Sequence, residues 1–541
     1  MLAYQRLVYQ QVYEYIVWIF NIFDMVMYCP ATLSTQMFKT TRGKRNKMPP
    51  FETCNARIAF SGTQGNAADI TKVVSIYMQR GYEVIGRKGV FAQAIADTDI
   101  DGPFDGSSLK ELCQNTRWTP GLIFKCDPPT GGVGIVRNIY LNCLRFAIEA
   151  GATSFIIPEM IASRKLPDLA QGNKQTLLHA NPPQSFERFF DLEHFTHSLR
   201  TTCPDIRTIS HQNELWDKPS TAVPLQLDPF ELSGPNIGDV ILSSPEKWAE
   251  SFRDWLNKSH LKPYSEEKPV VVTIMNPLLQ LPLGYDEPRF VANFGKVLRF
   301  SEDVRRLAGT VVFALNQRFG FGIHPDRGGV QEHYYYGAHL RTEGDATSAN
   351  WTGYEDQAEN YLEAAKSSGL KVVYLTTGND RDKIRFAKDA ANSSVTVATK
   401  EDLLNAHGFE KEFPEMQNLG WEQKLLIDYQ VLLRSSIFGG THESSFSWNI
   451  AMRRHVLAGD GSWIPNGNKT ASHERSKGRR SEGIRWNDKM GKEGLEKGEL
   501  WKSIISEHLQ DKEERQSFRD GLSTIFGPVS EGRVFGLAVW P

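Results

Sequence analysis

The side chains best suited to binding an anion occur in residues 428–454. An apolar helical run there is followed by a short strand at 437–438, a glycine turn at 439–441 and the serine-rich start of a second helix at 444–447. Backbone N–H groups at a helix N-terminus and serine hydroxyls are hydrogen-bond donors, and the helix dipole favours negative charge. The segment predicts an anion site, although an ordinary serine-capped helix has the same local pattern.

A second group of polar side chains follows the strand-like run at 333–336. His339 and Arg341 point to the same side if the strand continues, because side chains alternate along a strand. Arginine presents a planar fork that matches phosphate oxygens and stays charged. His339 can donate to a phosphate or sugar oxygen, and Asp345 can orient either residue. The structural alternative is a buried Arg–Asp pair that holds a loop in place.

A glycine-rich turn at 131–134 separates a predicted strand at 122–125 from a long amphipathic helix, for which Gly151 is a plausible stop. Glycine lets a backbone approach a ligand closely, as a cradle for phosphate or sugar requires. The same kind of turn also occurs where a helix only packs on a strand.

Taken together and in this order, the three motifs resemble those of the GDP-fucose protein O-fucosyltransferase family, most closely its fungal branch. The family shows a glycine turn before its first long helix, then His-x-Arg-x-x-x-Asp, and then Asp, Phe-x-Gly and Ser-Ser-Phe-Ser/Thr. The resemblance covers roughly residues 112–541. The matching residues are Gly131–Arg137, His339, Arg341, Asp345, Asp428, Phe438, Gly439 and Ser444–Ser447.

The resemblance implies a GT-B-type α/β fold, in which two Rossmann-like domains with parallel sheets face each other across a cleft. It implies a glycosyltransferase that moves a sugar, fucose by family precedent, from a GDP-sugar to a hydroxyl of a protein or glycan. Transfer is metal-independent and inverting in the family, without a cofactor. Arg341, assisted by His339, is the predicted catalytic residue, since it can neutralise the leaving diphosphate. The predicted substrate-binding residues are Gly132, Gly134, Arg137, Asp345, Asp428, Ser444, Ser445 and Phe446.

Two of these residues have a further predicted role. Arg137 can reinforce the first turn, and Asp428 can hold the nucleoside or the serine loop. No Asp-x-Asp occurs in a suitable loop, so the sequence makes no obvious provision for a divalent metal.

The first glycine turn departs from the family pattern. Active members carry Asn there, and one branch adds a Glu just before it as catalytic base. Here the Asn position holds Gly134 or Ile135, and the Glu position holds Gly131. Glu159 and Glu343 are the alternative candidates for the base. The alternative function is a catalytically inactive nucleotide- or glycan-binding relative.

Strand-like and helix-like runs alternate from residue 118 onward, which indicates parallel sheets in two halves. A length of 541 residues also favours two domains. We expect an N-terminal Rossmann-like domain at 111–305 and a C-terminal nucleotide-sugar-binding domain at 306–541, with a mobile charged loop at 466–499. The predicted strands are 122–125, 154–158, 206–210, 270–275, 311–316, 334–340, 372–376 and 395–398.

The N-terminal region allows several interpretations. Residues 1–55 form a hydrophobic and basic segment, whose apolar part at 12–28 is about long enough to span a bilayer. A membrane anchor, an amphipathic helix and a gene-model artefact are comparable alternatives. Residues 56–110 resemble a small βαβ extension. Their strand, glycine turn and helix also admit a nicotinamide-dependent enzyme, although the full dinucleotide fingerprint is missing.

Charge and cysteine content bear on partners and compartment. A net charge of −2 gives no indication of nucleic-acid binding. None of the six cysteines has metal-ligand spacing. We expect disulfides Cys113–Cys126 and Cys143–Cys203 in an oxidising compartment. Four Asn-x-Ser/Thr sequons also favour the secretory pathway, and we expect the lumen of the ER or Golgi.

Overall fold

The computed structural model describes residues 87–129, 131–161, 183–232, 240–260, 263–458, 516–528 and 535–541, together with two short strands. These strands, β1 (Val26–Tyr28) and β2 (Arg57–Ala59), pair antiparallel within a first compact unit, Met1–Lys88. The second unit, Gly89–Pro541, holds all the predicted site residues. The charged loop at 466–499, nearly all of the apolar segment, and residues 60–86 of the βαβ-like extension lie outside the described residues.

The first sheet of the second unit has five parallel strands in the order β5-β4-β3-β7-β6. Its middle strand, β3, leads into α4, whose sequence is apolar almost all round and is buried over nearly its whole length. Gly151 ends α4 in the left-handed conformation with φ 72°, as the sequence predicts. The strands are β3 (Thr119–Cys126), β4 (Ala152–Ile156), β5 (Arg207–Ile209), β6 (Leu225–Leu227) and β7 (Val270–Ile274).

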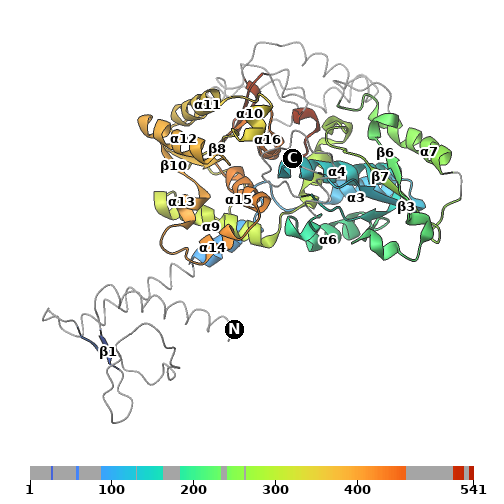
Figure 1. Cartoon of the computed structure of the whole chain (residues 1–541), viewed down its shortest axis with the longest axis horizontal. Coiled ribbons are helices and arrows are strands. Elements are labelled where there is room, and N and C mark those ends of the chain that lie inside the picture. Colours follow the sequence, from blue (N-terminus) through green and yellow to red (C-terminus); the bar gives the residue numbers. More distant parts are fainter. Residues whose placement is uncertain are drawn as a thin grey trace, which may run out of the picture. The chain divides into compact units, whose positions relative to one another are not determined.

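Helices accompany this sheet, and Figure 1 shows several of them around its strands. In the described part of the chain they include α3 (Ser107–Asn115), α4 (Val133–Ala150), α6 (Leu192–Thr202), α7 (Trp248–Ser259) and α8 (Pro288–Phe294). The short 3₁₀ segments η4 (Gln212–Leu215) and η5 (Pro219–Thr221) follow β5.

The second sheet has six strands in the order β10-β9-β8-β11-β13-β12, all parallel except β12. The strands are β8 (Tyr336–His339), β9 (Val372–Thr376), β10 (Thr396–Ala398), β11 (Ile437–Thr441), β12 (Gln516–Arg519) and β13 (Ser523–Phe526). The helices include α10 (Gly344–Ser348), α11 (Tyr354–Ser367), α12 (Asp380–Asn392), α13 (Lys400–Leu404), α14 (Glu412–Gln417), α15 (Trp421–Leu433) and α16 (Ser445–His455). The predicted α/β fold with two Rossmann-like, largely parallel sheets is confirmed.

One predicted strand is wrong. Residues 311–316 belong to the long helix α9 (Glu302–Phe319). Its acidic first turn and Gly320, at φ 65° after its last turn, are helix boundary signals. The β-branched pair Val311 and Val312 resembles a strand only because α9 is buried around its middle. The expected domain boundary near 305 falls inside this helix, and the division into two domains stays a prediction.

The two halves share one hydrophobic core. A continuous cluster of buried side chains includes residues of both sheets and of the C-terminal segment, and α4 packs against α16. The segment 535–541 ends between the sheets (Figure 1), where the Trp540 ring packs on Phe290 and Phe294. The Trp540 indole N–H donates to Asn142 Oδ1 at 2.6 Å. The C-terminal tail therefore packs back on the fold.

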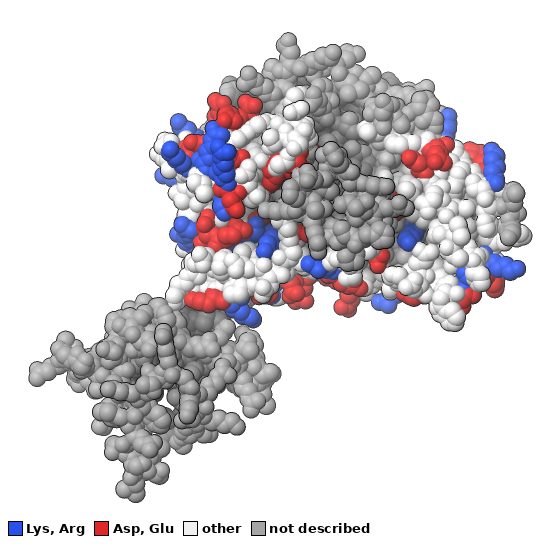
Figure 2. Space-filling model, in the orientation of Figure 1, with Lys and Arg blue, Asp and Glu red and all other residues white. Residues whose placement is uncertain are grey.

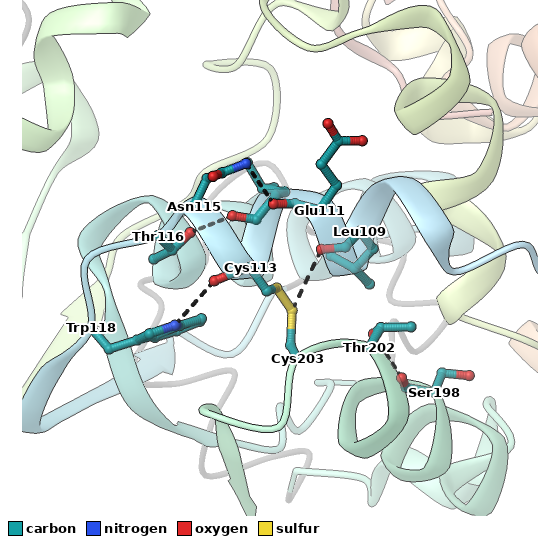
Figure 3. The surroundings of a disulfide bond; sticks show 10 residues. Leu109, Glu111, Cys113, Asn115, Thr116, Trp118, Ser198, Thr202 and Cys203 are labelled. Atoms are coloured by element: carbon teal, nitrogen blue, oxygen red, sulfur yellow. Dashed lines mark hydrogen bonds between the residues drawn. A yellow bond between two sulfur atoms is a disulfide. The ribbon is translucent and has the colours of Figure 1, made fainter.

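The disulfide pairing differs from the prediction. The bonds are Cys113–Cys203, with 5.4 Å between Cα atoms, and Cys126–Cys143, with 5.9 Å. Cys126 is the last of the eight residues of β3, and the strand starts after Cys113. The extended strand therefore places roughly 25 Å between its first residue and Cys126. Figure 3 shows the first bond joining α3 to the end of α6. Cys29 and Cys54 lie outside the described residues.

The described surface carries mixed charge. In the face that Figure 2 shows, acidic and basic side chains lie next to one another. This interleaving agrees with the net charge of −2. Within the described ranges, no helix is long and apolar enough to cross a membrane.

Candidate active site

The strand order of the second sheet identifies its ligand crevice. β8 and β11 are neighbours, and the chain proceeds from β8 toward one edge of the sheet and from β11 toward the other. Doubly wound sheets bind ligands outside the carboxyl ends of the strands at such a switch point. His339 is the last residue of β8, and β11 ends at Thr441, three residues before Ser444. The second and third motifs therefore meet at this point.

The serine motif forms the start of α16. Ser444 is the N-cap, and its Oγ accepts a hydrogen bond from the Ser447 N–H at 3.4 Å. Ser444 is therefore an ordinary helix cap. The Ser445 hydroxyl and the first backbone N–H groups of α16, which have no acceptor within the helix, lie at the carboxyl edge of the sheet. These groups and the helix dipole are suited to an anion.

His339 joins the two motifs directly. Its Nδ1 lies 2.8 Å from the Ser447 hydroxyl oxygen, and its ring centroid lies 4.7 Å from that of Phe446. Burial lowers the pKa of His339 to about 3, and the charge of Arg341 lowers it further in the same direction. The imidazole is therefore neutral near pH 7 and acts through a hydrogen bond, not through a positive charge.

Arg341 is held by carboxylates beside the same strand end. Its guanidinium donates to Asp345 Oδ1 at 2.9 Å, forms an ion pair with Glu343, and lies 5.2 Å from the centroid of the Trp351 ring. Burial works against the charge, but Asp345 and Glu343 raise the pKa of Arg341 above its usual value. The Arg–Asp pair considered from the sequence is thus present, and it orients a guanidinium whose side chain stays 17% exposed.

Glu343 is fixed on both sides. It pairs with Arg341 and accepts a hydrogen bond from the Gly378 N–H in the turn after β9. A Cβ atom at Gly378 would lie 2.6 Å from Glu343 Oε1, so a larger residue there would displace the Glu343 carboxylate. A carboxylate bound to an arginine and to a backbone donor is a poor candidate for the catalytic base.

The first glycine turn reaches the serine motif. A Cβ atom at Gly134 would lie 2.7 Å from the backbone nitrogen of Phe446 and 2.8 Å from the carbonyl carbon of Ser445. The Asn449 side chain reinforces this approach by donating to Gly134 O at 3.3 Å and to Ser445 O at 2.8 Å. At Gly132, by contrast, an added Cβ would meet no atom within 4 Å. All three motifs therefore converge around Phe446.

Arg137 reinforces this junction. Its buried guanidinium donates to Asn449 Oδ1 at 3.0 Å, Trp540 O at 2.8 Å, Gly295 O at 2.9 Å and Pro541 O at 2.6 Å. The side chain thus connects α4 with α16 and with the C-terminal segment. These contacts support the reinforcing role predicted for Arg137, and direct contact with a substrate stays a prediction.

The hydrogen-bond and ion-pair partners of Asp428 come from outside the serine motif. It is buried in α15, where it binds Lys400 Nζ at 2.6 Å and accepts a hydrogen bond from the Tyr374 hydroxyl at 2.6 Å. Burial raises the pKa of Asp428 to about 6, against the lowering effect of Lys400. Its direct bonds hold the β9 and β10 side of the sheet, and a role at the serine loop stays a prediction. Binding of a nucleoside at this place stays a prediction.

Glu443 is a positioning residue that sequence reasoning missed. It accepts hydrogen bonds from the backbone N–H of Thr352 at 2.6 Å and from the Thr352 hydroxyl at 2.8 Å, and it lies 3.0 Å from His442 Nδ1. Burial raises the pKa of Glu443, but the bonds from His442, Thr441 and Thr352 outweigh it and lower the value to about 2. The carboxylate ties the turn that bears Trp351 to the serine loop. A Glu directly before the Ser-Ser pair was the available signal.

No cluster of three or more His, Cys, Asp or Glu side chains is arranged to hold a metal ion in the described part of the chain. Arg341, the hydroxyls and N–H groups at the start of α16, and the neutral His339 are groups at this strand end that can meet a diphosphate.

Comparison with known proteins identifies the family. Residues 122–457 match GDP-fucose protein O-fucosyltransferase. No curated protein matches the chain. Among solved structures, POFUT1 in complex with GDP shares 16% identity with a TM-score of 0.37, covering 62% of this chain and 95% of that chain.

Two further solved structures resemble this chain to a similar extent. A mutant form of FUT1 of Arabidopsis thaliana in complex with GDP shares 10% identity with a TM-score of 0.32, covering 65% of this chain and 73% of that one. The fucosyltransferase NodZ from Bradyrhizobium shares 14% identity with a TM-score of 0.30, covering 63% and 92%. The family match spans more than half of the present chain and includes all three motifs. The chain therefore belongs to the GDP-fucose protein O-fucosyltransferase family and is a glycosyltransferase.

Proposed function

We propose that the protein transfers fucose from GDP-fucose to a hydroxyl of a protein or glycan, with inversion at the sugar carbon and without a metal ion. The observation that carries the proposal is the convergence of the three motifs around Phe446. His339 contacts Phe446 and Ser447 from β8, while Gly134 contacts the backbone of Ser445 and Phe446 from α4.

The leaving diphosphate sets the main requirement. As the bond between the sugar carbon and the phosphate oxygen breaks, negative charge grows on GDP. Arg341 supplies the positive charge, and Ser444, Ser445 and the N–H groups of α16 supply donors in a partly buried setting, where such interactions are strong. Arg341 then exchanges part of its contact with Asp345 and Glu343 for phosphate oxygens.

The acceptor hydroxyl needs a base, and Glu159 is the better of the two candidates. Glu343 is bound to Arg341 and Gly378. Glu159 follows β4, and its side chain stays 35% exposed. The Ile161 N–H donates to Pro129 O at 3.1 Å, so this segment lies beside the chain that enters the first glycine turn. We assign Glu159 to accept the proton of the attacking hydroxyl.

One observation favours the second candidate function, a nucleotide- or glycan-binding relative without turnover. A Cβ atom at Gly134, one of the two positions aligned with the Asn of active family members, would lie within 3 Å of the backbone of α16, so a side chain there requires α4 and α16 to move apart. Under this alternative the phosphate site binds GDP, and the fucose contacts are lost.

The location we propose is the lumen of the secretory pathway. Two disulfides in the described chain fit an oxidising compartment, and the family match supports the same location. Anchoring through residues 12–28 remains part of the proposal.

Calorimetry with GDP followed by a GDP-fucose hydrolysis assay separates the two functions. We expect GDP binding together with slow release of fucose, and Glu159→Gln is expected to keep GDP affinity while transfer to an acceptor is lost. GDP binding without any release of fucose would establish the inactive relative. Absence of GDP binding would refute both.

A further inference from the structure

The first sheet carries a cavity that the donor site does not use. It has a volume of about 340 Å³ and lies at the carboxyl ends of β3, β4 and β5, covered by η4 and η5. Its polar and aromatic lining includes Lys125, Glu159, His211, Gln212, Asn213 and Trp216. We call it the β3–β5 pocket. Its size is at the small end of the range for pockets that bind small ligands.

An ordered hydrogen-bond chain runs along one wall of the pocket. The backbone N–H of Asn213 donates to His211 Nδ1 at 3.1 Å, so this nitrogen is an acceptor and the proton of the neutral ring lies on Nε2. His211 Nε2 faces Glu159 Oε1 at 3.4 Å. The imidazole therefore lies against one oxygen of Glu159, and Glu159 itself lines the pocket.

An exposed indole forms another part of the wall. Trp216 is 86% exposed, a high value for so large an aromatic side chain. Water contact at an indole is unfavourable, and a ligand that covers its face gains apolar burial. An exposed aromatic surface beside polar groups in a concave site is typical of ligand binding.

The lining carries charges of both signs, with Glu159 beside Lys125 and Lys218. Glu159 repels phosphate or carboxylate groups, and Lys125 Nζ donates to Gln212 Oε1 at 2.7 Å, so this mixed lining suits a ligand that is neutral and rich in hydroxyls. A pyranose ring combines an apolar face, which fits the indole, with hydroxyls, which fit the Glu159 carboxylate and the His211 and Asn213 side chains. An extended peptide lacks this combination in so small a space.

We propose that the β3–β5 pocket binds a neutral sugar ring and that the acceptor of this enzyme is a glycan. The inference rests on the proposed function, because it places the acceptor beside Glu159, the proposed base. In the reaction the bound hydroxyl oxygen bonds to the fucose carbon, the carbon–phosphate oxygen bond breaks, GDP leaves with the electron pair, and the proton passes to Glu159.

A glycan array tests the inference on the full chain with intact disulfides. The array carries neutral oligosaccharides ending in glucose, galactose, mannose or N-acetylglucosamine, and peptides with Ser and Thr on the same surface. Three proteins are compared: wild type, Trp216→Ala and Val223→Ala. Val223 is a matched control because it is 82% exposed and does not line the pocket.

We expect wild type and Val223→Ala to bind the same sugar spots, and Trp216→Ala to lose at least about tenfold in affinity. Capture by peptides alone, equal sugar binding by Trp216→Ala, or no capture at all would overturn the inference. Fucose release from GDP-fucose is measured on the same wild-type sample. Fucose release without glycan capture refutes only the proposed sugar binding by the β3–β5 pocket. Glycan capture by a protein that binds no GDP in calorimetry refutes only the proposed donor site.

Discussion

The contact between Gly134 and α16 gives the sharpest prediction about how the halves are joined. A Cβ atom at this position would lie 2.7 Å from Phe446 N and within 3 Å of two further backbone atoms. Ordinary contact begins near 3.4 Å, so α4 and α16 must separate by about 0.7 Å. Both helices are buried here, and overpacking of this kind costs about 1–3 kcal/mol.

Gly132→Ser provides a matched control for Gly134→Ser. The same residue is introduced two positions away, where an added Cβ meets no atom within 4 Å, and serine caps a helix at least as well as glycine. We expect Gly134→Ser to melt a few degrees lower than wild type by differential scanning calorimetry, and Gly132→Ser to melt close to it. GDP affinity should also fall in Gly134→Ser, because the start of α16 moves. Equal melting temperatures for the two variants would refute the close-packing argument.

Three other predictions concern stability. Cys113→Ser removes a bond that closes 90 residues and should cost about 4.6 kcal/mol, whereas Cys143→Ser removes one that closes 17 and should cost about 3.1 kcal/mol. Denaturant titration under oxidising conditions checks this order, and the reverse order would contradict it. The pKa of His339 is lowered from 6.5 to about 3, so its contribution to stability is present above pH 6.5 and is lost as pH falls toward 3. As the pH falls from 6.5 to about 4, the free energy of unfolding should therefore decrease less for His339→Gln than for wild type. Equal decreases in the two proteins would show that His339 does not cause the effect. Asp428→Asn removes the shorter of the two ion pairs of the buried Lys400, which keeps Glu401 at 3.2 Å, and should cost up to about 3–5 kcal/mol by chemical unfolding, so a loss below about 1 kcal/mol would mean that the pair with Asp428 is not formed.

Much of the fold and the place of the site follow from local patterns. Strand and helix periods alternate, and turns after parallel strands share one edge of a sheet, so the motifs at His339 and Ser444 could be placed together. The burial of α9 hid its helical period, because apolar residues on all faces read as a strand at Val311 and Val312.

Long-range partners could not be predicted in the same way. The bonds of Arg137 reach Gly295 and Trp540, and Cys113 pairs with Cys203 across 90 residues. Sequence spacing gives no measure of such distances until the sheet order is known. The close approach at Gly134 belongs to the same class, because a glycine in a turn indicates freedom of the backbone but not the neighbour that requires it.

The most direct test of the donor site is GDP-fucose turnover by Arg341→Ala beside wild type. One transition-state donor is worth about 2.7–4 kcal/mol, so the variant should lose at least about a hundredfold in kcat. Arg341→Ala also removes the ion pairs with Asp345 and Glu343, so its melting temperature is measured beside turnover, and turnover is compared at a temperature at which both proteins are folded. Wild-type turnover in Arg341→Ala would contradict the assignment of the leaving-group site to the carboxyl ends of β8 and β11.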